Sequence, residues 1–447
     1  MAETLDSMRL IFDNVRVFDG VQENLSAPAR VVVEDGLIAE VTGLDAADAG
    51  SGPAGAAGPA GKAGAAGAAG AAGAAGTVID GGGRVLMPGL IDAHWHAMMA
   101  SLPMAQLATA DLGYIYLAAG REAERTLLRG FTTVRDAGGP SFGLKQAIDD
   151  GLIHGPRIYP SGAFISQTSG HGDFRTPHDL PKQGLTFIET AGVTAIADGV
   201  DDVLRATREQ LMRGASQIKL MAGGGVASPH DPLDVTQFTE AELRAAVEAA
   251  ENWGTYVMVH AYTPRSVQQA IRAGVRCIEH GHLLDDETAA QMATQEVWWC
   301  LQPFLDDEDA IPMADPVNRA KQLTMVQGTD TAYELARRHG VRVAWGTDTL
   351  FDPKLATRQG AQLAKMGRWF TPAEVLRMAT SGNAELLALS GERDPYPRPL
   401  GVIEPGAYAD LLLVDGDPLA DLAVLADPAN LTVIMKNGEI IRDARTP

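Results

Sequence analysis

"TEAELRAAVEAAENWGTYVMVH", residues 239–260, joins an amphipathic helix to a short apolar strand. Thr239 and Glu242 have the spacing of a capping box, which predicts the start of a helix at this point. Apolar residues then recur at helical spacing, and Gly254 stands where the helix is expected to end. The run "TYVMVH" that follows is typical of a buried strand, and it ends in His260.

The same helix–strand unit recurs along the chain on the carboxyl side of this stretch. "PRSVQQAIRAG" leads to "VRCIEH", "DETAAQMATQE" leads to "VWWCLQP", and "GTDTAYELARRHG" leads to "VRVAWGTD". Repeated units of this kind predict a parallel sheet with right-handed crossovers, either doubly wound or closed into an eight-fold barrel. Because no GxGxxG follows the first strand, we favour a (β/α)8 TIM barrel over residues 88–399.

Short alternating strands lie at both ends of the chain. The pairs "ARVVVEDGLIAEVTG" and "LTVIMKNGEIIRD" each contain a two-residue hairpin signal, at Asp35-Gly36 and Asn437-Gly438. We therefore predict a small β-sandwich domain built from residues 1–87 and 400–447. Between its strands, a glycine at every third position from Gly52 to Gly76 marks a low-complexity loop at about 46–76. A collagen-like tether is disfavoured, because one short tract with two prolines holds three chains together poorly.

Composition excludes several classes of partner. Acidic residues outnumber basic ones by 57 to 36, and a net charge of −21 repels nucleic acid and anionic membranes. The amino terminus has no basic segment followed by an apolar core, and no run of about 18 apolar residues predicts a membrane span. A cytoplasmic location is the default expectation. Cys277 and Cys300 both lie in apolar runs, which favours core thiols over a disulfide or a cysteine metal cluster.

Five of the predicted barrel strands end in residues able to bind a metal. One of them, Lys219, stands between Ile218 and Leu220, where a buried apolar residue would be expected. The carboxyl ends of barrel strands open onto one mouth, and residues two apart in a strand point to the same face. A lone histidine in a strand is more often a core residue than a ligand, but the whole set together predicts a metal centre. Its members are His94, His96, Lys219, His260, His280 and Asp348.

These motifs resemble those of the amidohydrolase superfamily across nearly the whole chain. The matching segments are "PGLIDAHWH", "IKL", "VH", "EHGH", "WGTD" and "GVIEPGAYADLLLVD". Within the superfamily, "SGAFISQTSGHGD" and "HAYTPRSVQQAI" look most like the branch that includes Xaa-Pro dipeptidases, ochratoxin-type amidases and, more distantly, imidazolonepropionase. The resemblance implies a binuclear metal-dependent hydrolase that acts on C–N bonds.

The resemblance also implies a role for each ligand. His94, His96 and Asp348 would hold one divalent metal, and His260 and His280 the other. Lys219, carboxylated by carbon dioxide, would bridge the two, which accounts for a lysine in a buried strand because burial favours the reactive neutral amine. A bridging hydroxide would attack the carbonyl, and Asp348 would pass the proton to the departing nitrogen. Zinc is the expected metal, although manganese, iron or cobalt would suit the same ligands.

The branch implies a small substrate with a free carboxylate, such as an N-acyl amino acid or a dipeptide. Arg265 is the predicted carboxylate partner, with Tyr262 adding a hydroxyl; a surface arginine is the equally weighted alternative. His171 and Asp173, in "GHGD", are predicted to line the substrate pocket, with closure of a turn as the alternative. His282 is predicted either to contact substrate or to order His280.

Three alternatives to this function stay open from the sequence. The first is a hydrolase of a cyclic amide or lactone, as in imidazolonepropionase. The second, a mononuclear deaminase, is disfavoured because such relatives lack the bridging lysine. The third is an assembly protein that has kept the barrel but lost its ligands, which the presence of every ligand here disfavours. The family is commonly oligomeric, so we expect a homo-oligomer.

Overall fold

The computed structural model describes residues 9–43, 76–228 and 230–445, and its strands form three sheets. The low-complexity loop predicted at 46–76 lies, except for Gly76, outside the described residues. Within the described part of the chain, no helix combines the length and the apolar character that a bilayer crossing requires.

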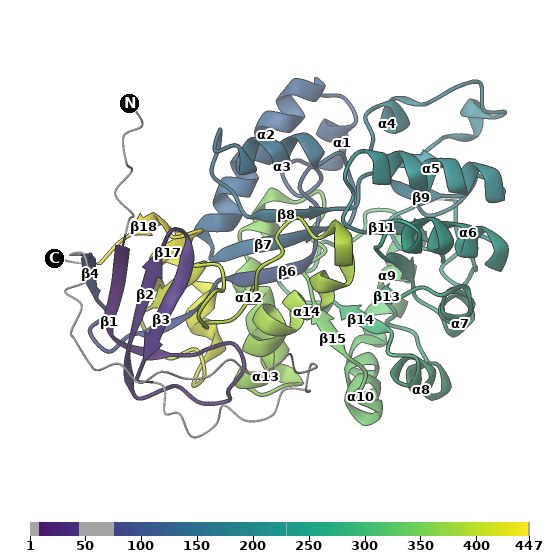
Figure 1. Cartoon of the computed structure of the whole chain (residues 1–447). Helices are drawn as coiled ribbons and strands as arrows, with labels where there is room; N and C mark the ends of the chain where they lie inside the picture. The colour runs from purple at the N-terminus through teal and green to yellow at the C-terminus, as the bar shows by residue number, and fades with distance from the viewer. Residues whose placement is uncertain (1–8, 44–75, 229, 446–447) are drawn as a thin grey trace, which may run out of the picture.

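The first sheet, here called the terminal sheet, unites the two ends of the chain (Figure 1). Its order is β18-β17-β16-β5-β1-β2-β3, with β4 paired to β1. Both predicted hairpins are confirmed, because β2 pairs with β3 around Asp35-Gly36 and β17 pairs with β18 around Asn437-Gly438. The strands are β1 (Arg9–Val17), β2 (Pro28–Glu34), β3 (Leu37–Thr42), β4 (Thr77–Asp80), β5 (Val85–Pro88), β16 (Leu411–Val414), β17 (Leu431–Lys436) and β18 (Glu439–Asp443).

The other two sheets are wholly parallel, which confirms the predicted α/β class. The three-stranded sheet has the order β6-β7-β8, and the seven-stranded sheet has the order β10-β9-β11-β12-β13-β14-β15. The strands are β6 (Leu90–Trp95), β7 (Phe131–Asp136), β8 (Arg157–Pro160), β9 (Phe164–Ser166), β10 (Thr194–Ile196), β11 (Ile218–Met221), β12 (Val257–Ala261), β13 (Cys277–His280), β14 (Trp298–Leu301) and β15 (Val343–Trp345).

Individual hydrogen bonds join the two parallel sheets at both of their meeting edges. At one edge, the Asn383 side-chain amide donates to the carbonyl of Ile91 in β6 at 2.7 Å and to that of Trp345 in β15 at 2.8 Å. At the other edge, the backbone N–H of Ser216, just before β11, donates to the carbonyl of Pro160 in β8 at 2.8 Å. The parallel strands therefore form one continuous scaffold.

Helices connect the parallel strands, and several begin and end as the sequence predicts. The capping box at Thr239 and Glu242 is formed, and α7 and α10 end at Gly274 and Gly340 in the left-handed conformation. The helices are α1 (Met104–Leu107), α2 (Leu112–Leu128), α3 (Phe142–Asp149), α4 (Phe187–Thr190), α5 (Val200–Met212), α6 (Glu240–Glu251), α7 (Pro264–Ala273), α8 (Asp286–Thr294), α9 (Pro316–Gln327), α10 (Thr329–His339), α11 (Pro353–Ala356), α12 (Gln359–Ala364), α13 (Pro372–Arg377) and α14 (Asn383–Leu387).

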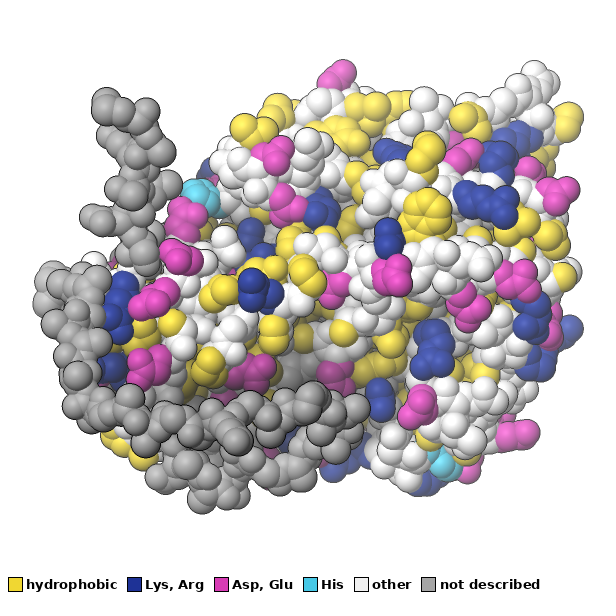
Figure 2. Space-filling model, viewed as in Figure 1, with side chains coloured by type: hydrophobic (Ala, Val, Ile, Leu, Met, Phe, Trp, Pro, Cys, Tyr) yellow, Lys and Arg dark blue, Asp and Glu magenta, His cyan; other side chains and the backbone are white. Residues whose placement is uncertain are grey.

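The largest apolar cluster fills the space between the parallel strands and their helices. All residues of β11, β12, β13 and β14 are buried, as expected for parallel strands covered on both faces. The outer surface is different: on the face in Figure 2, acidic and basic side chains are interspersed with scattered apolar ones. Because the parallel strands are buried on both faces, a polar side chain within them needs a specific explanation.

Candidate active site

The six predicted metal ligands come together at one cavity. His94 lies in β6 and His96 just after it, Lys219 in β11, His260 in β12 and His280 at the end of β13, while Asp348 follows β15. All six line a cavity of about 480 Å³. The parallel strands thus bring to one point residues that are widely separated in sequence.

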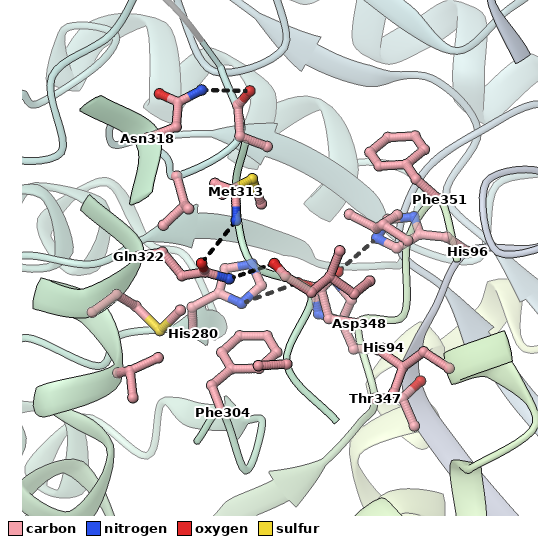
Figure 3. Close-up of a pocket in the computed structure, with 18 of the residues that line it drawn as sticks. His94, His96, His280, Phe304, Met313, Asn318, Gln322, Thr347, Asp348 and Phe351 are labelled. Carbon is pink, nitrogen blue, oxygen red and sulfur yellow. Dashed lines mark hydrogen bonds and ion pairs between the residues drawn. The ribbon is translucent and has the colours of Figure 1, made fainter. Parts of the chain in front are cut away.

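Asp348 lies among three of these histidines (Figure 3). Its Oδ1 atom is 3.3 Å from His94 Nε2 and 3.2 Å from His96 Nε2, and its Oδ2 atom is 3.8 Å from His280 Nδ1. The ligand atoms of His94, His96 and Asp348 lie within 4.8 Å of one another. Although burial opposes ionisation, the neighbouring histidines hold the pKa of Asp348 well below its usual value. This carboxylate is therefore ionised at neutral pH.

Each of the four histidines has one ring nitrogen engaged with a fixed partner. Such partners orient a metal-binding imidazole, and the second ring nitrogens of His94 and His96 both face Asp348, so the arrangement fits divalent cations. The pairs are His94 Nδ1 with Glu279 Oε2 at 2.6 Å, His96 Nδ1 with the Gly138 carbonyl at 3.1 Å, His260 Nε2 with the Gly224 carbonyl at 3.2 Å, and His280 Nδ1 with Gln302 Oε1 at 2.7 Å. Burial lowers the pKa of His260 and His280 well below the usual histidine value, which keeps both rings neutral.

Lys219 is only 2% exposed, and burial lowers the pKa of its amine. Among the residues that the structure describes, none forms a hydrogen bond or an ion pair with its Nζ atom. A buried ammonium without a partner is costly, so the neutral amine is favoured. The glycines that follow allow the chain to pass close by: a Cβ on Gly225 would lie 1.9 Å from the ring of His171.

Two of the ligands have a backbone conformation that non-glycine residues rarely adopt. His280 has φ 73° and Asp348 has φ 49°, both in the left-handed region. Strain of this kind costs about 1–3 kcal/mol per residue and persists where the surroundings enforce it. Here the His280 carbonyl accepts from Trp299 Nε1 at 2.7 Å, and the Asp348 N–H donates to the His94 carbonyl at 2.8 Å.

Three further residues, which were not predicted from the sequence, contact the predicted ligand His94 or its strand. Glu279 and Arg135 are fully buried and form an ion pair at 2.7 Å, and the other oxygen of Glu279 accepts from His94. Arg135 also donates to the carbonyl of Ala93 at 2.6 Å. Asp92 accepts from the N–H of His94 and from Thr347. The available signal was an acidic or basic residue within each of three strand segments, LIDAHW, FTTVRD and CIEH.

Two of the predicted substrate contacts do line the cavity. The ring of His171 stacks on His260 with centroids 4.2 Å apart, and its Nδ1 lies 2.7 Å from Ser228 Oγ. Tyr262 is buried, with its ring 5.4 Å from that of His280. Burial raises the pKa of the Tyr262 phenol, so this group stays protonated.

The other three predicted substrate contacts, Asp173, Arg265 and His282, do not line the cavity. Arg265 is exposed at the start of α7, whose buried face begins at Ser266. Asp173 is paired with Arg175 through two contacts of 2.8 and 2.7 Å, which closes its own loop.

His282 lies behind the cavity, where its Nε2 donates to the carbonyl of Gln302 at 3.0 Å. Burial lowers the pKa of His282 to about 4, so the ring is neutral. Since the Gln302 side chain contacts His280, His282 supports that ligand through Gln302. The predicted role in ordering His280 therefore agrees with the geometry better than the predicted contact with substrate.

Parallel strands with histidines and a carboxylate converging at their carboxyl ends define the class: an α/β protein with a candidate metal-dependent active site. The model of the amidohydrolase family matches residues 85–441, and the chain belongs to this family. It is accordingly a hydrolase that acts on C–N bonds.

Similar proteins include an ochratoxinase, a prolidase and a Xaa-Pro dipeptidase. The ochratoxinase of Aspergillus niger is 33% identical over 388 residues, which cover 81% of this chain and 78% of the relative. A prolidase crystallised with N-methylphosphonate-L-proline is 34% identical, with a TM-score of 0.84 and coverage of 98% of this chain and 100% of that one. A Xaa-Pro dipeptidase with bound methionine is 26% identical, with a TM-score of 0.79 and coverage of 97% and 100%.

Proposed function

We propose that the protein cleaves the amide or peptide bond of a small N-acyl amino acid or dipeptide. One observation carries this proposal: a buried lysine that has no hydrogen-bond or ion-pair partner among the described residues, four oriented histidines and an ionised aspartate line the same cavity. The names of the relatives, an ochratoxinase, a prolidase and a Xaa-Pro dipeptidase, support the choice of bond.

The proposal includes two divalent cations, with zinc as the expected metal. His94, His96 and Asp348 would hold one cation and His260 and His280 the other, with carboxylated Lys219 shared between them. When bound, the cations would activate a water molecule and polarise the scissile carbonyl. The fixed partner of one nitrogen in each histidine ring, and the lowered pKa of the Lys219 amine, support this assignment.

Asp348 would carry the proton during the reaction. Its low pKa keeps it ionised, so it can accept a proton from the attacking water and deliver it to the departing nitrogen. Tyr262 and His171 would flank the bound substrate from β12 and from the loop after β9. No protein nucleophile is needed.

We also propose that the two parallel sheets close into an eight-stranded barrel, in which β8 and β9 share one position and β10, which pairs with β9, stays outside the barrel. The terminal sheet would belong to a smaller β-sandwich domain. The hydrogen bonds of Asn383 to β6 and β15, and of Ser216 to β8, support closure. A closed barrel would hold the six proposed ligands rigidly, because they come from five different strands or from the residues just beyond them.

A free carboxylate on the substrate is part of the proposal, but Arg265 is not its partner. Among the described residues, the lysines and arginines that line the cavity are Lys219 and Lys365. The Nζ atom of Lys365 lies 2.6 Å from Asp307 Oδ2 and 2.5 Å from Asp309 Oδ2. A substrate carboxylate could replace Asp307 in this cluster, so we assign its recognition to Lys365.

The test is amine release from a panel of N-acyl amino acids and dipeptides by zinc-loaded protein, each compared with its C-terminal carboxamide. We expect turnover of the carboxylates, its loss after chelation, and its return with zinc. Lys365→Met should raise KM for the carboxylates more than for the carboxamides, whereas Arg265→Met should change neither. Turnover of cyclic amides or lactones alone would contradict the proposal.

A further inference from the structure

The candidate ligands lie between two separate apolar surfaces of the cavity. The two surfaces, here called the Met99 wall and the Met325 wall, belong to two separate clusters of apolar residues. The Met99 wall consists of Met99, Phe164, Phe174, Met221, Leu350 and Phe351. The Met325 wall consists of Val226, Tyr262, Phe304, Met313, Met325 and Val326. Figure 3 shows Phe351 beside His96, and Met313 and Phe304 on the side of His280.

The Met99 wall is fixed to the ligand strands. The N–H of Met99 donates to the carbonyl of His96 at 3.2 Å, and the N–H of Phe351 donates to the carbonyl of Met99 at 2.8 Å. Phe164 packs edge-on against Phe174 with centroids 6.1 Å apart. This wall is therefore preformed beside the His94 and His96 end of the site.

The Met325 wall depends on the irregular segment 303–315, which follows β14 and contributes much of the cavity surface. Gln322 of α9 pins this segment by accepting from the N–H of Met313 at 3.2 Å and donating to the carbonyl of Ile311 at 2.8 Å. Tyr262 and Phe304 from this wall both stack against His280, with centroids 5.4 and 6.4 Å away.

Charged groups at the rim of the cavity are paired with one another rather than with the walls. Lys365 contacts Asp307 and Asp309, and Asp309 also contacts Arg358. The two walls themselves contain no charged residue. Placing a charged group against them would cost several kcal/mol, since nothing there would replace its hydration.

We propose that the substrate carries a large apolar group, preferably aromatic, on each side of the scissile bond, with one group against each wall. This inference rests on the proposed function, because the ligands that would act on the bond lie between the walls. The cavity of about 480 Å³ falls within the range of sites that enclose a drug-sized ligand, so it has room for two such groups.

Binding of uncleavable analogues tests the inference without relying on turnover. In a ketomethylene analogue of an N-acyl amino acid, CH2 replaces the amide N–H, so hydrolysis cannot occur. Calorimetry on zinc-loaded protein would compare four analogues, with phenyl or methyl on the acyl side and on the amino acid side. We expect each phenyl-to-methyl change to weaken binding about 10-fold or more.

Two variants show which wall contacts which side of the analogue. Phe351→Ala should reduce the preference for phenyl on one side of the analogue, and Met325→Ala should reduce it on the other side. Met212→Ala is the control for surface effects, because Met212 is 78% exposed on α5 and outside the cavity. Circular dichroism of each variant would verify folding before the comparison.

Three results would overturn the inference: equal binding of all four analogues, tighter binding of analogues with lysine or glutamate side chains, or loss of the same preference in both variants. If phenyl groups on both sides strengthen binding but the matching amides are not hydrolysed, the result contradicts the proposed function instead. The two walls would then form a ligand-binding site only. Failure of the two proposals is therefore distinguishable.

Discussion

The terminal sheet and the active-site cavity both place non-glycine residues in the left-handed backbone region, but for different reasons. In the terminal sheet, Asp35 has φ 50° and Asn437 has φ 53°, and a glycine follows each in a two-residue turn. In the cavity, His280 has φ 73° and Asp348 has φ 49° at the ends of parallel strands, where no hairpin demands it.

The left-handed conformation is favoured by the local sequence in the terminal sheet and imposed by the surrounding structure in the cavity. Asp and Asn tolerate this conformation well, and the hairpin turn requires it, so the terminal sheet adopts it at little cost. Histidine has less preference for it, so the conformation of His280 is maintained by its surroundings. In the cavity these angles occur at two predicted ligands that converge with the others, whereas in the terminal sheet the same angles only reverse the chain.

The largest effect should separate two lysines, the buried Lys219 of the cavity and the partly buried Lys436 of the terminal sheet. Lys219→Met removes the proposed shared ligand, and we expect activity to fall about 10⁴-fold or more and metal content to fall below two per chain. Lys436→Met, at the end of β17, is the matched control and should keep both. Mass spectrometry of bound metal and amine release would measure the two effects. Full metal content in Lys219→Met would remove Lys219 from the ligand set.

The second prediction compares Asp348 with Asp35, two aspartates that have similar φ angles. Asp348→Asn should lower kcat about 10²–10⁴-fold, because the amide can neither accept nor deliver the proton. Asp35→Asn should leave kcat unchanged, since asparagine suits the same turn. Steady-state kinetics on the best amide of the panel would provide both values. Equal kinetics for the two variants would show that Asp348 transfers no proton.

A smaller effect should follow from weakening the contact between Glu279 and His94. Glu279→Gln keeps the size of the side chain but removes the charge that Arg135 and His94 both contact. We expect zinc affinity to fall about 10–100-fold, as is usual when the partner of a metal-binding histidine is changed. Competition with a zinc chelator dye would measure it. Unchanged affinity would mean that Glu279 only stabilises the fold.

The smallest effect concerns stability in the terminal sheet. Burial lowers the pKa of Lys436 to about 8 from 10.5, so the charged amine is destabilising in the folded protein at neutral pH. Between pH 8 and 10.5 the unfolded chain binds more protons, so this group should make stability rise with pH.

Lys436→Met should therefore be more stable than the parent by about 1–2 kcal/mol at pH 7, and this advantage should shrink as pH approaches 10.5. Urea unfolding of both proteins at several pH values would measure the difference. A constant difference across this range would show that Lys436 titrates normally.

Much of this molecule follows from its sequence, because the decisive signals are local. Asp35-Gly36 specifies a turn, Thr239 and Glu242 specify a helix start, and histidines at strand ends need only a parallel sheet to meet. The resemblance to a known superfamily then supplied the role of Lys219, which no local pattern reveals.

The supporting residues and substrate contacts were harder to predict, because they depend on orientation and distant partners. Arg265 is near His260 in sequence, but its position on α7 turns it to solvent. Glu279 acquires its role only from Arg135, which is 144 residues away. The segment 303–315 has no regular structure, so nothing in its sequence indicates that it lines the cavity.

The order of strands in the terminal sheet has a consequence for synthesis of the chain. β5 pairs with β1 on one side and with β16 on the other, so an early and a late segment share one sheet. Everything from Gly89 to Asp410 must leave the ribosome between them, which takes on the order of tens of seconds at ordinary translation rates. During that time the edge of β5 that pairs with β16 in the folded protein lacks its partner strand.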